Sequence, residues 1–120
     1  MIRKTINWNL FSIINLIVII YCSFFIVPGT SEIPSIIPHI DKIGHFLLYA
    51  SQALGIKMML FNSNFKNYNR LTLIICFFIG LLIEVLQPIL TMNRLFDFFD
   101  ILANIVGATL TISILKPIKK

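Results

Sequence analysis

Four long apolar runs dominate the chain, and each has about the length a helix needs to cross a lipid bilayer, roughly 20 residues. They cover residues 8–27, 42–61, 71–90 and 95–115. The first ends at a Pro-Gly pair and the fourth ends before Pro117. Because the runs are apolar around most of their circumference, they indicate helices buried in protein or lipid. We therefore predict an all-α fold, a four-helix transmembrane bundle.

The composition excludes both an ordinary soluble domain and a disordered chain. Of the 120 residues, 58% are hydrophobic and 12% are charged, and the mean hydropathy is +0.90. Soluble domains average about 45–50% apolar and about 25% charged residues. The length fits a single domain over residues 1–120. The net charge of +5 does not indicate a nucleic-acid partner, because the basic residues lie at the ends of apolar runs.

The basic residues also predict the orientation of the bundle. Cytoplasmic loops of membrane proteins carry an excess of Lys and Arg. With four spans, the N-terminus, the 62–70 connection and the C-terminal tail share one side, which with its flanks holds eight of the ten basic residues. We therefore expect both termini in the cytoplasm. All the acidic residues and both histidines then fall in the outer half: Glu32, Asp41, Glu84, Asp97, Asp100, His39 and His45.

Polar residues of the last three runs form one stripe on each helix, within arcs of roughly 60–80° at about 100° per residue. The stripes consist of Asp41, His45, Tyr49 and Gln52; Gly80, Glu84 and Gln87; and Asp97, Asp100, Asn104, Gly107 and Thr111. A charge facing lipid costs at least ~2.5–3.5 kcal/mol at the membrane centre. The stripes should therefore face one another. We expect an outward-open polar pocket, with a floor formed by Asn104, Tyr49 and Gln52 and a rim formed by Arg94, Asp97 and Lys42.

Three motifs in these runs carry a resemblance to a known family. Residues 41–49 read DKIGHFLLY, residues 80–87 read GLLIEVLQ and residues 94–107 read RLFDFFDILANIVG. In this order they resemble the motifs of VanZ-like membrane proteins, and the match spans roughly residues 38–111. The chain departs from the pattern in two places. Thr111 stands where members often carry a further Gly, and Thr91-Met92-Asn93 replaces the usual Pro-Gly before Arg94.

The resemblance implies a small, multi-pass protein of a bacterial cell membrane, inner or plasma. The family is named for a protein associated with resistance to the glycopeptide teicoplanin, and similar proteins are widespread in bacteria without an assigned activity. A role in envelope physiology or antibiotic tolerance is therefore the expectation for this chain. Membrane lipid is the expected partner, and association of several copies is left open.

The first functional hypothesis is ligand binding in the outer pocket. A pocket with both signs of charge suits a lipid head group, a cell-wall intermediate or a glycopeptide. Arg offers a bidentate fork to phosphate or carboxylate, and Lys a point charge. The predicted ligand-binding residues are Asp41, Lys42, His45, Tyr49, Glu84, Gln87, Arg94, Asp97, Asp100 and Asn104.

Two alternatives remain open. A membrane-embedded enzyme could act on a lipid-linked substrate, with a His/carboxylate or divalent-metal site; its catalytic candidates are His45, Glu84, Asp97 and Asp100. No nucleophile motif or phosphate loop is present. Because a lone His among carboxylates is more often a hydrogen-bonding partner than a ligand, we predict no resident metal and no cofactor. In the other alternative the polar residues only lock the helices together.

Overall fold

The computed structural model describes residues 6–25, 40–91 and 95–116. Regular structure in this part of the chain is helical throughout, which confirms the all-α prediction. The four helices are α1 (Trp8–Phe25), α2 (Ile40–Asn62), α3 (Tyr68–Leu90) and α4 (Phe98–Ile114). Each overlaps one of the apolar runs, and their bounds lie within three residues of the expected ones.

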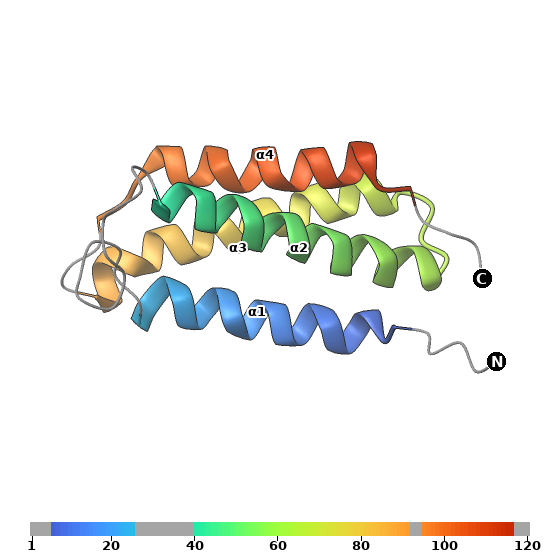
Figure 1. Ribbon diagram of the computed structural model, residues 1–120, viewed down its shortest axis with the longest axis horizontal. Helices are drawn as coiled ribbons and strands as arrows, with labels where there is room; N and C mark the ends of the chain where they lie inside the picture. The colour runs from blue at the N-terminus through green and yellow to red at the C-terminus, as the bar shows by residue number, and fades with distance from the viewer. Residues whose placement is uncertain (1–5, 26–39, 92–94, 117–120) are drawn as a thin grey trace.

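The helices form an up-and-down antiparallel bundle (Figure 1). α2 packs against all three other helices, and most extensively against α4. α1 lies on the opposite side of the bundle from α4 and packs against α2 and α3 (Figure 1). The first turn of α1 and the last turn of α4 lie at the same end of the bundle. The polar stripes of α2, α3 and α4 meet near the other end.

The start of α4 differs from the expected start at residue 95. Asp97 has an extended backbone conformation and occupies the N-cap position of the helix, and its side chain accepts a hydrogen bond from the main-chain N–H of Phe99 at 2.9 Å. An Asp at this position satisfies a main-chain donor that has no partner within the helix. Asp97 therefore stops the helix from extending further toward the N-terminus and lies outside the polar stripe of α4.

The distribution of polarity is inverted relative to a soluble protein. Several of the most buried side chains are polar, with Glu84, Gln87 and Thr72 at 0% exposure. Large apolar side chains project outward instead from α1, α3 and α4, among them Ile17, Phe78, Leu82, Phe99 and Ile114. Monomeric soluble proteins rarely expose continuous apolar surface of this extent. Among the described helices, α1 and α3 are long and apolar enough to cross a membrane, and α4 is a shorter apolar helix.

Gly107 allows a close approach between α2 and α4. A Cβ atom at this position would clash with the main-chain oxygen of Phe46, and it would lie 3.3 Å from the main-chain nitrogen of Ala50. Small residues let helix backbones approach closely in this way. One turn further along, the Thr111 hydroxyl hydrogen-bonds the main-chain oxygen of Ala50 at 3.1 Å. Thr111 is therefore compatible with the close packing despite replacing the Gly found in similar sequences.

Candidate functional site

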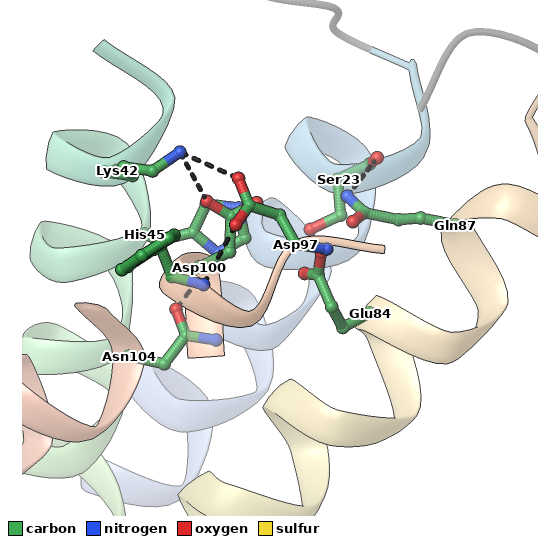
Figure 2. A network of polar contacts seen from close by, with 9 residues as sticks. Ser23, Lys42, His45, Glu84, Gln87, Asp97, Asp100 and Asn104 are labelled. Atoms are coloured by element: carbon green, nitrogen blue, oxygen red, sulfur yellow. Dashed lines mark hydrogen bonds and ion pairs between the residues drawn. The ribbon is translucent and has the colours of Figure 1, made fainter. Parts of the chain in front are cut away.

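Three ionisable side chains from three different helices converge near one end of the bundle. His45 of α2, Glu84 of α3 and Asp100 of α4 each offer a nitrogen or oxygen atom, and these three atoms lie within 4.8 Å of one another. All three side chains are buried. The prediction that the stripes of α2, α3 and α4 face one another is therefore met at these positions (Figure 2). With their direct neighbours they form the polar cluster, which consists of Lys42, His45, Glu84, Asp97, Asp100 and Asn104.

Lys42 and Asp97 form the exposed part of the polar cluster. The Lys42 Nζ atom lies 2.9 Å from Oδ2 of Asp97 and 3.4 Å from Oδ1 of Asp100 (Figure 2). The Lys42 and Asp97 side chains are 26% and 35% exposed, whereas that of Asp100 is only 4% exposed. The hydrogen bond from Lys42 lowers the pKa of Asp97, which precedes the first residue of α4. The cluster thus presents one charge of each sign at its surface and keeps further carboxylates beneath them.

His45 is held from two sides. Its Nδ1 atom lies 3.0 Å from Oδ1 of Asn104, and its ring lies nearly parallel to the ring of Tyr49, with centroids 6.2 Å apart. In this orientation of the Asn104 amide, its oxygen accepts the hydrogen bond and Nδ1 donates it. The Nε2 atom lies 3.6 Å from Oδ2 of Asp100. A histidine oriented in this way has the geometry of a proton acceptor or a metal ligand.

Glu84 joins α3 to the beginning of α4. Its Oε1 atom accepts a hydrogen bond from the main-chain N–H of Asp97 at 2.8 Å. Asn104 packs nearby against Gly80 of α3, where a Cβ atom would lie 2.7 Å from the Asn104 amide nitrogen and 3.4 Å from the Tyr49 ring. The glycine of α3 therefore makes room for the amide and the ring beneath the carboxylates. These contacts place the Asn104 amide and the Tyr49 ring next to each other against α3.

Two predicted polar residues turn away from the cluster toward α1. Gln87 donates from Nε2 to the main-chain oxygen of Ser23 at 2.9 Å (Figure 2), and Gln52 donates to the main-chain oxygen of Ser12 at 3.3 Å. The expectation that Gln52 lies in the pocket floor is therefore wrong. Its amide packs against α1 because that helix offers polar groups of its own. Gln87 still lies one turn from Glu84, and its role in ligand binding stays a prediction.

The polar residues of α1 were missed by the sequence analysis. Asn15 donates to Oε1 of Gln52 at 2.7 Å and accepts from the Ser51 hydroxyl at 2.8 Å. Ser12, Asn15 and Ser23 fall on one face of α1 within an arc of roughly 80° at about 100° per residue. This periodicity was the signal that could have identified them. They connect α1 to α2 and α3 rather than adding to the polar cluster.

Lys57 was interpreted only as a marker of orientation, and the structure gives it a second role. Its side chain is only 2% exposed, and Nζ donates to the main-chain oxygens of Ile112, at 2.9 Å, and Leu115. These carbonyl groups lie at the C-terminal end of α4, where a positive charge is favourable. Lys57 therefore joins the far end of α2 to the end of α4.

Two predicted site residues lie partly or wholly outside the described residues. The backbone of Asp41 belongs to the first turn of α2, but its side chain is not described, and Arg94 lies in the undescribed segment 92–94. Their proposed contacts with a ligand stay predictions. Of the other predicted residues, the structure brings Lys42, His45, Glu84, Asp97 and Asp100 together, with Asn104 and Tyr49 beneath them and Gln87 beside them.

Comparison with known proteins gives one positive result. The family model described as VanZ/LLP1 matches residues 1–119, almost the whole chain. No significant match was found among curated proteins or solved structures. The matched residues include the three motifs that supply the side chains of the polar cluster.

Proposed function

The chain belongs to the VanZ/LLP1 family, and on this premise we propose that it is an integral membrane protein whose polar cluster binds a charged head group at the outward-facing surface of the cell membrane. The ligand class is a lipid, a lipid-linked cell-wall intermediate or a glycopeptide that carries a phosphate or carboxylate together with an amine. The observation that carries the proposal is the Lys42–Asp97 pair, which lies 2.9 Å apart at the exposed part of an otherwise buried polar cluster.

All four helices cross the membrane in this proposal. Their lengths of 18, 23, 23 and 17 residues lie within the range of about 17–25 that spans a bilayer. Among the described residues, α2 and α4 each carry three buried polar or charged side chains, as α3 does, but these face inward, and the outward face of α4 is apolar. The polar stripes therefore do not prevent either helix from lying in lipid, because the helices cover each other's polar groups.

Both termini lie in the cytoplasm, and the polar cluster faces outward. The end of the bundle opposite the polar cluster carries four basic residues, Lys57, Lys66, Arg70 and Lys116. This agrees with the enrichment of basic residues on the cytoplasmic side of membrane proteins. A C-terminal green fluorescent protein should fluoresce in cells, and a C-terminal alkaline phosphatase should be inactive. The reverse pattern would place the polar cluster on the cytoplasmic side and overturn an outer-surface role.

The chemistry of the exposed pair favours a ligand with two charges. A phosphate can replace Asp97 as the partner of Lys42, and an amine can replace Lys42 as the partner of Asp97. The exchange preserves charge pairing on both sides, so the desolvation cost of separating the pair is offset by two new charge-assisted hydrogen bonds. A head group with phosphate alone satisfies only Lys42. This difference predicts a preference for zwitterionic head groups with a primary amine.

Head-group binding can be measured on purified protein in detergent. Short-chain phosphatidylethanolamine, phosphatidylglycerol and phosphatidylcholine, and teicoplanin in a parallel series, are titrated and followed by native mass spectrometry. We expect phosphatidylethanolamine or teicoplanin to bind more tightly than the other two ligands. Lys42→Met and Asp97→Asn should weaken that binding about tenfold, the loss of roughly one charge-assisted hydrogen bond.

Lys66→Met is the matched control, because Lys66 is an exposed lysine near the opposite end of the bundle. It should leave the affinity unchanged. Equal binding of all four ligands by the wild type, Lys42→Met and Asp97→Asn would refute head-group recognition. In that case the polar cluster only holds the helices together, and the two variants would differ from the wild type in stability alone.

A further inference from the structure

The buried part of the polar cluster has the arrangement of a metal site. One donor atom each from His45, Glu84 and Asp100 lies within 4.8 Å of the other two, and the residues come from three packed helices (Figure 2). Zinc binds imidazole nitrogen and carboxylate oxygen at about 2.0–2.2 Å, so two ligands of one tetrahedral ion lie roughly 3.4 Å apart. The His45 Nε2 and Asp100 Oδ2 atoms are already 3.6 Å apart.

The separation between His45 and Asp100 is compatible with a shared cation. A direct hydrogen bond between a ring nitrogen and a carboxylate oxygen requires about 2.7–3.2 Å. The observed 3.6 Å is longer than such a bond, and it fits both an ion pair with a protonated His45 and two ligands of one ion. The metal analysis described below separates these two arrangements.

The partner of Nδ1 supplies independent support. Histidines that bind a metal through one nitrogen almost always donate the other N–H to a carbonyl or carboxylate oxygen. Here the Asn104 amide oxygen lies 3.0 Å from Nδ1, which directs the lone pair of Nε2 toward Asp100. The carboxylates are oriented as well, since Glu84 accepts from the Asp97 N–H at 2.8 Å and Asp100 lies 3.4 Å from the Lys42 Nζ atom. Each of the three side chains thus has a neighbour that fixes its orientation.

We propose that His45, Glu84 and Asp100 bind one divalent transition-metal ion, zinc or manganese, through Nε2 and one oxygen of each carboxylate. Imidazole favours zinc and carboxylate oxygen favours manganese, so a mixed donor set fits either ion better than magnesium, which prefers oxygen ligands. Three protein ligands leave a fourth position for water. From the sequence we predict no resident metal, whereas the geometry of these side chains favours the divalent-metal alternative.

Metal content of the purified protein tests the site without any lipid or activity. The full chain is stripped with a chelator, dialysed separately against zinc or manganese, washed and analysed by inductively coupled plasma mass spectrometry. The wild type should retain about one ion per chain of at least one of the two metals. Glu84→Gln and Asp100→Asn, which preserve side-chain shape, should each reduce the retained metal about tenfold or more.

Glu32→Gln is the matched control, because it removes a carboxylate that is not one of the three ligands. It should retain the metal, which separates coordination from general attraction to negative charge. Asn104→Ala should weaken the affinity by about 10–100-fold without removing the ligands. Circular dichroism and size-exclusion chromatography identify variants that have failed to fold, and a metal-dependent rise in the melting temperature of the wild type provides a second readout.

The proposal is overturned if the wild type retains no more zinc or manganese than Asp100→Asn, or if Glu32→Gln loses as much metal as Asp100→Asn. Either outcome is independent of head-group binding, which is measured with the exposed residues Lys42 and Asp97.

Discussion

The buried carboxylate of Glu84 accepts a hydrogen bond from the main-chain N–H of Asp97 at 2.8 Å, so a side chain of α3 holds the N-cap residue of α4. Glu84→Leu leaves this N–H without its acceptor, whereas Glu84→Gln keeps a carbonyl oxygen in the same place. We expect the Leu variant to be less stable than the Gln variant by about 1 kcal/mol. Unfolding in detergent micelles titrated with sodium dodecyl sulfate measures the difference, and equal stabilities would contradict the role assigned to this bond.

A second prediction concerns the close approach of α2 and α4. Gly107→Ala would place a methyl group against the main-chain oxygen of Phe46, and neither helix backbone can yield without moving the helix. We expect a loss of about 1–3 kcal/mol in the free energy of unfolding. Gly44→Ala is the control, because a Cβ atom there meets nothing within 4 Å. It should be neutral or stabilising by roughly 0.5–1 kcal/mol, since Ala is the better helix former. Similar effects of the two substitutions would refute the packing argument.

A third prediction concerns Lys57. Lys57→Met keeps an unbranched side chain but removes the donor to the carbonyl oxygens of Ile112 and Leu115. The variant should lose about 1–3 kcal/mol, the cost of leaving buried polar groups without a charged partner. Lys66→Met removes the same charge from an exposed position and should change the stability by less than about 0.5 kcal/mol. If the two variants unfold alike, Lys57 is only a determinant of orientation.

A fourth prediction tests the attachment of α1. Asn15 and Gln52 are joined at 2.7 Å, and hydrogen bonds of this kind contribute roughly 0.6–2 kcal/mol in membranes. A double-mutant cycle with Asn15→Ala and Gln52→Ala should yield a coupling energy in this range. The cycle of Asn15→Ala with Gln87→Ala is the control, because Gln87 bonds Ser23 instead. Its coupling should be close to zero, and equal values for both pairs would argue against a direct bond.

The sequence predicted most of the fold because apolar runs of bilayer length have few alternatives to helix. The stripe on α4 also predicted correctly that Asp100 and Asn104 face inward, since a helix places residues four apart on one face. The start of α4 was predicted less well. The apolar run already includes Leu95 and Phe96, whereas the helix begins only at Phe98, after its N-cap residue Asp97. Capping depends on a single side chain, so the average hydropathy of a segment does not predict it.

Pairings between helices were the part that periodicity could not supply. Lys57 lies near the end of the second apolar run, beside the basic 62–70 connection. Nothing in the neighbouring sequence indicates that its ammonium group bonds Ile112 at the end of α4, which is 55 positions away from Lys57. Gln52 lies on the same stripe as His45 and Tyr49, yet it bonds α1 because Asn15 and Ser12 stand opposite it. The partner of a buried polar side chain is set by which helix lies next to it, and that is decided by the tertiary arrangement.

Contacts between α2 and α4 lie at different heights along the pair, among them the Lys42–Asp97 ion pair, the approach of Gly107 to Phe46, and the bond from Lys57 to Ile112. Two helices joined near both ends and in the middle resist sliding past each other. We therefore expect any opening motion of the protein to move α2 and α4 together. The relative displacement would fall to α1 and α3, each of which packs less extensively against α2 than α4 does.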